Sequence, residues 1–355
     1  MKMRGRAGSV KKILKNSLKI IAMSLLLFML VGCYNANKAN VKAAGQTKNQ
    51  LSAWTVYWDL EEGEKEFRKF EKRLDEASVF GAYFEEDGKL FLPEELASDK
   101  RMSKKKKQLV EYLTIVNDRM LADGSKEYKR TEFLHDLVNN QARRKQHIDE
   151  IIALAKREHF DGVELDYERI WKDNQAKESF IPFIKELYTA AKANNLKLRV
   201  VLEPSTPFNA IEFPAGPKYV VMFYNLYGMH SGPGPKADHA FIQKILGRMV
   251  NVPEPKSVAF ATGGCMWNSE GDKKFITERE AAQLLEKYNT DARRDAASKA
   301  VTFKYREGTT VYEVWYADAA TLDYWISLAE ESGIRDIAIW RLGSNETLNK
   351  IKRLD

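Results

Sequence analysis

The chain has 355 residues, of which 44% are hydrophobic and 30% are charged, and its 57 Lys and Arg residues against 50 Asp and Glu residues give a formal net charge of +7. The apolar content, with 7 Trp, 15 Tyr and 17 Phe, excludes an intrinsically disordered chain. Two cysteines cannot hold a fold of this size together, so we expect a hydrophobic core to do so. A net charge of +7 would favour binding to a nucleic acid or an anionic membrane only if the folded part of the chain carried it.

The excess positive charge lies at the N-terminus. Seven basic residues and no acidic residue occur in positions 1–19, and the apolar stretch 20–31 that follows is too short to cross a bilayer comfortably. This pattern predicts an export signal over residues 1–32. Its removal leaves 50 basic residues (57 minus 7) against 50 acidic ones, so the net charge gives no support to a nucleic-acid partner.

The apolar stretch ends in Leu30-Val31-Gly32-Cys33, which resembles the lipobox of bacterial lipoproteins. The resemblance implies a lipidated Cys33, a flexible tether over residues 33–50, and a protein anchored in the lipid bilayer of the cell membrane and facing away from the cytoplasm. An ordinary signal-peptidase site before a chance cysteine is the alternative. Because Cys33 would be occupied by lipid, we expect Cys265 to be a free, buried thiol.

Short β-branched or aromatic runs alternate with amphipathic stretches along the rest of the chain. The runs predict strands at Trp54–Trp58, Ser78–Phe84, Tyr112–Val116, Gly162–Asp166, Leu196–Leu202, Tyr219–Tyr224, Ser257–Ala261 and Asp336–Trp340. The amphipathic stretches predict helices at Glu64–Glu76, Glu132–Arg157, Ala176–Asn194, Ala237–Met249, Thr277–Tyr288 and Ala319–Ser332.

Eight strands in this alternation predict a (β/α)8 TIM barrel over residues 51–355. A doubly wound open sheet is the competing fold, but no glycine-rich phosphate loop follows the first strand. The alternating segment Val301–Trp315 predicts a small β-hairpin inserted before the last strand.

The fourth predicted strand carries three acidic residues at every second position, Glu164, Asp166 and Glu168. Strand side chains alternate between faces, so the three carboxylates share the face opposite the apolar residues Val163, Leu165 and Tyr167. In a barrel they point inward, where mutual repulsion and burial keep at least one protonated and available as a general acid. Active sites of this fold lie at the carboxyl ends of the strands, where Glu168 falls.

Three other interpretations are open. The acids could be solvated on an edge strand, or could belong to a barrel that binds a ligand without catalysis. They could also bind a divalent metal, but the five histidines show no metal-binding spacing, so we expect neither a metal nor another cofactor.

Residues 161–168, Asp-Gly-Val-Glu-Leu-Asp-Tyr-Glu, resemble the DGxDxDxE signature of family 18 glycoside hydrolases, which include chitinases, endo-β-N-acetylglucosaminidases and peptidoglycan glucosaminidases. Met222-Phe-Tyr224-Asn225 resembles the Met-x-Tyr-Asp motif of this family, and Ile337–Gly343 resembles its final strand with Trp340 beneath the sugar. The segment Val311–Asp318 is similar to the corresponding segment in the bacterial branch of this family that acts on peptidoglycan and is associated with sporulation.

The resemblance implies a retaining, substrate-assisted hydrolysis of β-1,4 bonds at N-acetylglucosamine. Glu168 would be the acid and base, Asp166 would orient the acetamido group, Tyr224 would donate a hydrogen bond to it, and Glu164 would tune Asp166 from below. Glu164 stands where the family usually has Asp or Asn, and Asn225 stands where it usually has Asp, so Asn225 is assigned to hydrogen bonding with the sugar.

Aromatic and polar residues at the strand ends are candidates for contacts with the glycan, since sugar rings stack on aromatic faces. The predicted substrate-binding residues are Glu164, Trp340, Asn225, Tyr57, Tyr227, Asn117 and Met222. Asp118, Glu203 and Trp267 are weaker candidates. Packing or loop capping explains several of these equally well.

If the chain is an enzyme, we therefore expect a monomeric glycosidase that is anchored in the membrane and that binds a glycan containing N-acetylglucosamine. A lectin-like glycan-binding lipoprotein of the same family is the main alternative, although such proteins typically lack the acid that Glu168 supplies. A barrel that serves as a docking scaffold is a third possibility.

Overall fold

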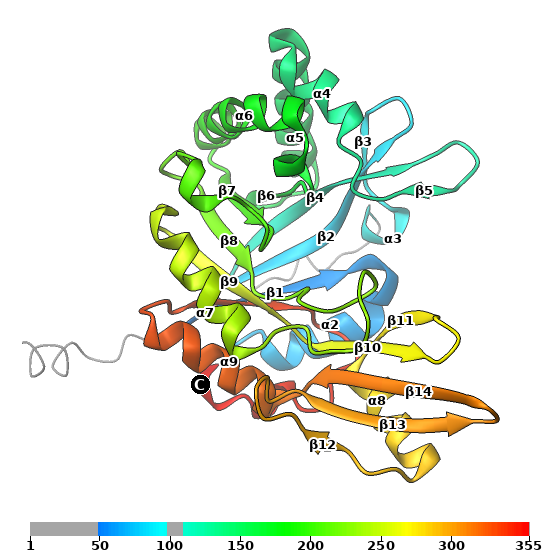
Figure 1. Ribbon diagram of the computed structural model, residues 1–355. Helices are drawn as coiled ribbons and strands as arrows, with labels where there is room; N and C mark the ends of the chain where they lie inside the picture. The colour runs from blue at the N-terminus through cyan, green and yellow to red at the C-terminus, as the bar shows by residue number, and fades with distance from the viewer. Residues whose placement is uncertain (1–48, 98–108, 355) are drawn as a thin grey trace, which may run out of the picture. The chain divides into compact units, whose positions relative to one another are not determined.

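Eight parallel strands close into a barrel in the computed structural model, which describes residues 49–97 and 109–354 (Figure 1). The barrel strands are β1 (Gln50–Val56), β2 (Glu76–Glu85), β4 (Val110–Met120), β6 (Gly162–Asp166), β7 (Lys197–Leu202), β8 (Lys218–Met222), β9 (Lys256–Ala261) and β15 (Asp336–Trp340). Each pairs in parallel with two neighbours, and the pairing of β15 with both β1 and β9 closes the ring. The predicted TIM barrel is confirmed.

Helices surround this barrel (Figure 1). They are α2 (Leu60–Phe70), α3 (Glu94–Ala97), α4 (Glu132–Asn139), α5 (Gln141–Arg157), α6 (Asn174–Ala193), α7 (His239–Arg248) and α9 (Ala319–Glu331). The helix α8 (Glu278–Tyr288) packs instead against an antiparallel sheet outside the barrel. The short strands β3 (Leu90–Phe91) and β5 (Lys126–Glu127) pair antiparallel with β2 and β4, beyond the barrel.

The long helix predicted at Glu132–Arg157 is two helices. Asn140 lies between α4 and α5 in an extended conformation, and its side-chain oxygen accepts hydrogen bonds from the backbone N–H groups of Ala142 (3.0 Å) and Arg143 (3.2 Å). Asparagine is a favoured N-cap because it satisfies these otherwise unpaired donors. The break is therefore built into the sequence at this residue.

The connection from β7 to β8 has no α-helix. Residues 203–217, all of them described, contain only the 3-10 helix Phe208–Ala210. Four prolines occur in this segment, and proline both lacks an N–H group and clashes with the preceding helical turn. The barrel thus departs here from a strict strand-helix repeat.

The predicted hairpin before the last strand is confirmed as β13 (Val301–Glu307) and β14 (Thr310–Ala317). It belongs to a larger antiparallel sheet, beside the barrel in Figure 1, that also contains β10 (Gly263–Asn268), β11 (Lys273–Ile276) and β12 (Arg293–Arg294). β10 follows β9 almost directly, so the inserted sheet begins at the carboxyl end of a barrel strand. That position places it beside the expected active site.

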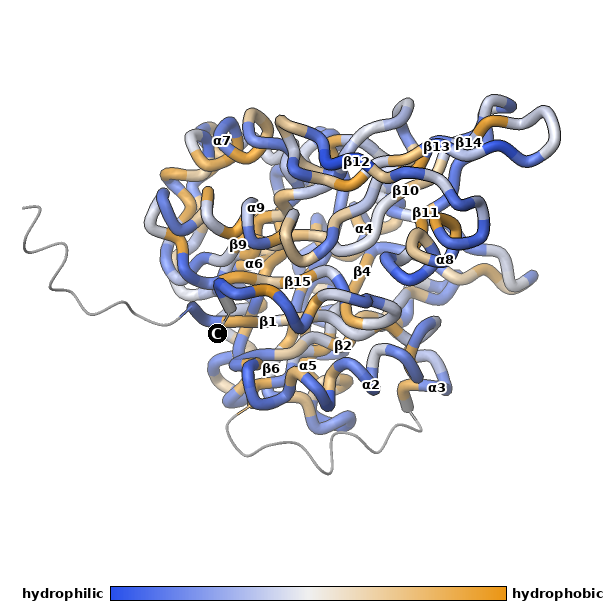
Figure 2. Tube along the Cα trace, turned by 90° about the horizontal axis from the view of Figure 1, so that it is seen from below, coloured by the Kyte–Doolittle hydropathy of each residue, from blue (hydrophilic) through white to orange (hydrophobic). Residues whose placement is uncertain are grey.

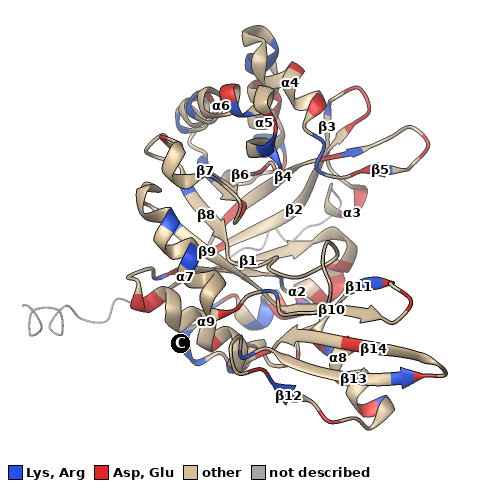
Figure 3. Ribbon diagram, in the orientation of Figure 1, with Lys and Arg blue, Asp and Glu red and all other residues tan. Residues whose placement is uncertain are grey.

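Hydrophobic side chains fill two layers. One core lies between the strands and the helices, and a smaller one inside the barrel includes Trp54, Val220 and Ala338. Figure 2 shows hydrophobic residues along β1 and β15, while hydrophilic residues cover much of α2. Lys and Arg are interspersed with Asp and Glu over the outer helices and loops (Figure 3).

The predicted signal, Cys33 and most of the tether lie outside the described residues. Asn49 is already in place, because its side-chain amide donates to the Glu330 carboxylate (2.6 Å) and to the Arg353 carbonyl (2.8 Å). Among the described residues, no helix has the length and apolar character needed to cross a membrane. Cys265 is a buried free thiol, as expected.

Candidate active site

A cleft of about 670 Å³ lies at the carboxyl ends of the barrel strands. Its floor contains Asp166, Glu168 and Tyr224, and its walls come from the segments after β1, β4, β8 and β15 and from the inserted sheet. The predicted residues that line it are Asp166, Glu168, Tyr224, Met222, Asn225, Trp340, Tyr57, Asn117 and Asp118. Residues far apart in the sequence thus meet where this fold positions active sites.

The strand β6 delivers the carboxylates because its ends are fixed. The Asp161 carboxylate accepts a hydrogen bond from the backbone N–H of Glu111 at 2.9 Å. Gly162 has no room for a side chain, since a Cβ there would lie 2.7 Å from the Lys197 carbonyl oxygen. On the outward face, Tyr167 packs in the helix-facing core, its hydroxyl 2.8 Å from His147 Nε2. The acidic residues therefore occupy the inward face.

Glu164 lies below the cleft and is fully buried. Its Oε1 accepts hydrogen bonds from Thr114 Oγ1 (2.7 Å) and from Trp54 Nε1. Its Oε2 lies 2.9 Å from Nε of Arg199, off the direction of a hydrogen bond, so this contact is an ion pair. The side chain does not line the cleft, and direct contact with substrate, which the sequence suggested, does not fit this position.

Arg199 is the residue that balances the charge of Glu164, and it was not among the predicted site residues. Its side chain is completely buried, and its guanidinium also lies 3.3 Å from Glu76 and against the rings of Trp54 and Tyr112. Buried charges need such compensation. The lowest of the three carboxylates is thus neutralised by the barrel itself.

Asp166 is nearly buried, and its Oδ1 has no hydrogen-bond partner among the described residues. Burial, and then the nearby carboxylates of Glu168 and Glu164, raise the pKa of Asp166 well above its ordinary value, while Lys129 opposes this shift. A protonated Asp166 is therefore favoured in the free site. Its unpartnered oxygen points to a group that a bound molecule would supply.

Asn117 fixes the backbone that carries Glu168. Its side-chain amide donates to the carbonyl oxygens of Glu168 (3.0 Å) and Arg130 (3.1 Å), and its side-chain oxygen accepts from the Glu168 N–H (2.9 Å). These bonds hold the start of the segment after β6 against the end of β4. Asn117 lines the cleft, and its predicted contact with substrate stays a prediction.

The Glu168 carboxylate pairs with Lys129, whose Nζ lies 2.5 Å from Oε2. Lys129 has a left-handed backbone conformation with φ of 55°, and its N–H donates to the Asp118 carboxylate at 2.8 Å. Burial alone would lower the pKa of Lys129, but the carboxylates of Glu168, Asp166 and Glu203 raise it above its ordinary value. Lys129 was not predicted, because no local pattern in the sequence marks it.

Tyr224 lies two residues after β8 and is buried. Burial, followed by the Asp166 and Glu168 carboxylates, raises its pKa well above the ordinary value, so its hydroxyl keeps its proton and can donate. Met222 packs inside the barrel, and Asn225 is exposed at the cleft with a left-handed φ of 70°. The motif residues therefore share one wall.

Aromatic rings surround the cleft. Trp340 packs edge-on against Trp54 and Phe80, and the Tyr57 hydroxyl accepts a hydrogen bond from Lys126 at 2.7 Å. Three exposed rings at the cleft were not predicted, namely Trp58, Tyr128 and Phe275. Trp58 adjoins a predicted residue and could have been found, whereas the other two lie on extensions outside the barrel pattern.

The predicted substrate-binding residue Tyr227 and the weaker candidates Trp267 and Glu203 lie away from the cleft lining. Tyr227 packs its ring on Gly234, where an added Cβ would approach it to 2.4 Å. Trp267 is buried and donates from Nε1 to the Ser231 carbonyl at 3.0 Å. Glu203 accepts from the backbone N–H of Arg169 at 2.6 Å. Their observed contacts are packing and loop capping.

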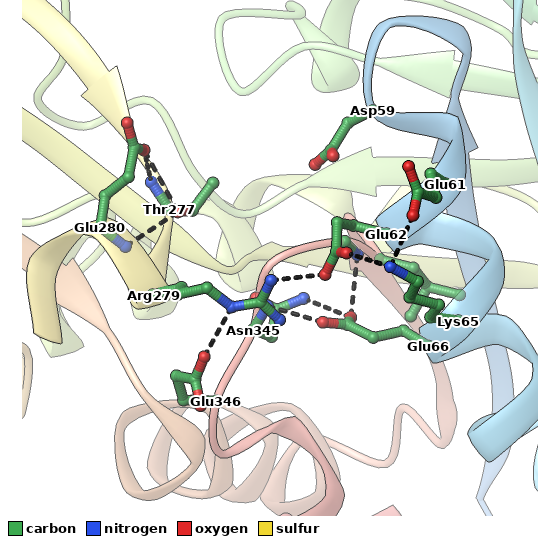
Figure 4. Close-up of polar contacts among 12 residues, drawn as sticks. Asp59, Glu61, Glu62, Lys65, Glu66, Thr277, Arg279, Glu280, Asn345 and Glu346 are labelled. Atoms are coloured by element: carbon green, nitrogen blue, oxygen red, sulfur yellow. Dashed lines mark hydrogen bonds and ion pairs between the residues drawn. The ribbon is translucent and has the colours of Figure 1, made fainter. Parts of the chain in front are cut away.

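The loop that follows Trp340 is anchored by Glu66 of α2 (Figure 4). The buried Glu66 carboxylate accepts hydrogen bonds from the backbone N–H groups of Gly343 (2.8 Å) and Asn345 (2.6 Å) and from the Asn345 side chain (2.8 Å). Arg279 of α8 joins the same region by pairing with Glu62 and Glu346. These contacts hold one wall of the cleft.

In the parts of the chain that the structure describes, no group of three or more His, Cys, Asp or Glu side chains is arranged to hold a metal ion. Of the acidic residues that line the cleft, Glu168 pairs with the Lys129 ammonium and Asp118 accepts a hydrogen bond from the Lys129 N–H. The Glu168, Asp166 and Tyr224 side chains of the cleft can transfer protons and form hydrogen bonds.

The family model of glycosyl hydrolases family 18 matches residues 53–345. The chain therefore belongs to this family and is a glycoside hydrolase with a TIM-barrel fold. The match begins within β1 and covers the rest of the barrel, the inserted sheet and every residue that lines the cleft.

The chain is also similar to individual proteins. It is 21% identical to the uncharacterized glycosylase YvbX of Bacillus subtilis over 92% of this chain and 94% of that protein. A chitinase structure from Chromobacterium violaceum superposes with a TM-score of 0.72 at 17% identity, covering 86% and 98% of the two chains. The structure of the spore cortex-lytic enzyme SleL from Bacillus megaterium superposes with a TM-score of 0.71 at 19% sequence identity. The superposition covers 85% of this chain and 72% of that chain.

Proposed function

We propose that this glycoside hydrolase cleaves β-1,4 bonds next to N-acetylglucosamine with retention of configuration, the 2-acetamido group of the substrate acting as nucleophile. The convergence of Asp166, Glu168 and Tyr224 in one aromatic-walled cleft carries the proposal. Similar proteins that are named a chitinase and a spore cortex-lytic enzyme support a substrate of this class. Family 18 enzymes are exceptions to the usual mechanism with two carboxylates.

In the first step, Glu168 donates its proton to the glycosidic oxygen and the bond from that oxygen to the anomeric carbon breaks. The acetamido carbonyl oxygen forms a bond to the same carbon, giving an oxazolinium ion. Asp166 orients the acetamido nitrogen and stabilises the positive charge, and Tyr224 donates a hydrogen bond to the acetamido oxygen. This step requires a protonated Glu168 and an ionised Asp166.

In the second step, Glu168 is a carboxylate and takes a proton from water. The water oxygen attacks the anomeric carbon, and the acetamido oxygen leaves. Two inversions at the same carbon give net retention. Lys129 pairs with the carboxylate form of Glu168, which is the form present between the two steps.

The N-terminal segment supports a second part of the proposal, that the enzyme acts as a lipoprotein. The basic residues, the apolar stretch and Leu30-Val31-Gly32-Cys33 would direct export and lipidation at Cys33. We expect the expressed protein in the membrane fraction, and the Cys33→Ala variant outside it. Equal membrane association of both proteins would contradict lipidation at this residue.

Activity is tested with the purified protein on chitin oligosaccharides, peptidoglycan and N-glycans. The enzyme should release reducing ends from at least one of them, and Glu168→Gln should abolish release without changing the melting temperature. If neither protein cleaves any of these glycans but both bind one equally, the chain is a lectin-like binder.

A further inference from the structure

Four cationic side chains line the cleft, and three of them have a partner. Lys126 donates to the Tyr57 hydroxyl at 2.7 Å, Lys129 pairs with Glu168 at 2.5 Å, and Arg341 pairs with Asp59 at 2.6 Å. The fourth is Lys236. Within the described residues, its ammonium group forms neither an ion pair nor a hydrogen bond with an acidic side chain.

Lys236 is fixed in place by its backbone. Its carbonyl oxygen accepts a hydrogen bond from the N–H of Leu226 at 2.9 Å, which closes the loop that begins with the motif residues Tyr224 and Asn225. Its Nζ lies 5.0 Å from the centre of the Phe275 ring, on the inserted sheet. The Phe275 side chain is 59% exposed, so this wall of the cleft is open to a bound molecule.

The environment of Lys236 disfavours an isolated positive charge. Burial, and to a lesser degree Arg341, lower its pKa, and only the Cys265 thiol opposes this shift. A lysine with a purely structural role usually extends its ammonium to solvent or pairs it with a carboxylate. Lys236 is only partly exposed, and among the described residues its ammonium has neither a carboxylate partner, as Lys129 and Arg341 have, nor a hydroxyl partner, as Lys126 has.

We propose that Lys236 binds an acidic substituent of the glycan, a carboxylate carried by a sugar of the chain that occupies the cleft. A carboxylate would supply the missing counter-charge, whereas the hydroxyl groups of a neutral sugar would not. The inference rests on the proposed function, because it places a glycan in this cleft. It selects amino-sugar polymers with carboxylate-bearing residues, such as muramic acid, over neutral polymers of N-acetylglucosamine.

The test uses two thio-linked oligosaccharides of N-acetylglucosamine and N-acetylmuramic acid, whose linkage resists hydrolysis. One carries the free lactyl carboxylate, and the other carries its primary amide. The wild-type protein should bind the carboxylate form about tenfold more tightly by calorimetry. Lys236→Met should reduce the ratio of the two dissociation constants to about one, mainly because the carboxylate form binds more weakly.

The matched control is Lys126→Met, which removes a paired lysine from the same cleft and should keep the preference for carboxylate. Equal binding of both ligands by the wild-type protein would overturn the proposal, and so would an undiminished preference in Lys236→Met. The experiment measures binding, so it separates failure of this proposal from failure of the proposed glycosidase activity. If only the glycosidase activity fails, natural substrates are not cleaved but the Lys236-dependent preference for the carboxylate ligand remains.

Discussion

The Lys129 ammonium lies 2.5 Å from the Glu168 carboxylate, although 39 positions separate them in the chain. Lys129 reaches this point because its backbone is tied to Asp118 at the end of β4, while Glu168 is tied to Asn117 of the same strand. The end of one barrel strand thus positions both members of the pair. A cation beside a general acid has its strongest effect when that acid is ionised.

Replacing Lys129 tests this relationship. In Lys129→Met we expect kcat to fall about tenfold, because the ammonium no longer stabilises the carboxylate that forms when Glu168 donates its proton. Lys129→Arg keeps the charge and should retain most of the activity. Steady-state kinetics on a soluble oligosaccharide measures both, and equal losses in the two variants would exclude an electrostatic role.

Tyr224→Phe should lower kcat by about tenfold to a hundredfold with a smaller change in KM, because the hydroxyl hydrogen bond strengthens as charge develops on the acetamido group. Tyr188→Phe, a change on α6 outside the cleft lining, provides the matched control. An unchanged kcat in Tyr224→Phe would remove this residue from the mechanism.

Arg199→Leu should lower the free energy of unfolding by about 3–5 kcal/mol, because it leaves the Glu164 carboxylate buried without its counter-charge. Urea denaturation measures the change. The double variant Arg199→Leu/Glu164→Leu should recover part of the loss, since it removes both charges. A loss below about 1 kcal/mol in the single variant would show that this ion pair does not stabilise the barrel.

His147 should make the fold sensitive to acid. Its ring is buried, and burial lowers its pKa from 6.5 to about 3. Between these values the unfolded chain binds a proton that the folded chain does not, so the stability present above pH 6.5 is lost as the pH falls, by about 1.4 kcal/mol per pH unit from this residue alone. Urea denaturation from pH 7 to 4 measures this slope. His147→Gln should flatten it, and an unchanged slope would contradict the assignment.

The sequence predicted the barrel because its signals are local. Each strand is a short β-branched or aromatic run, and Glu164, Asp166 and Glu168 alternate with apolar residues with the two-residue period of a strand. The helix break at Asn140 and the missing helix after β7 are also visible in hindsight, in a capping residue and four prolines. Local sequence patterns define the ends of helices and strands less well than they define the helices and strands themselves.

The partners of the carboxylates could not be predicted in the same way. Arg199 stands in an apolar strand, and its opposition to Glu164 depends on the register of β6 with β7. Lys129, Lys236 and Phe275 reach the cleft from loops and from the inserted sheet, through contacts between distant segments. No spacing in the sequence encodes those contacts, so the cleft walls required the folded structure.

The most direct test of the proposed mechanism is the configuration of the first product. Proton NMR recorded immediately after the enzyme is mixed with a soluble β-1,4-linked N-acetylglucosamine oligosaccharide, or with a peptidoglycan fragment if only that is cleaved, distinguishes the two anomers of the new reducing end. Because the proposed mechanism retains configuration, the β anomer should appear first and only later equilibrate with the α anomer. Initial release of the α anomer would contradict the substrate-assisted mechanism assigned to Asp166, Glu168 and Tyr224.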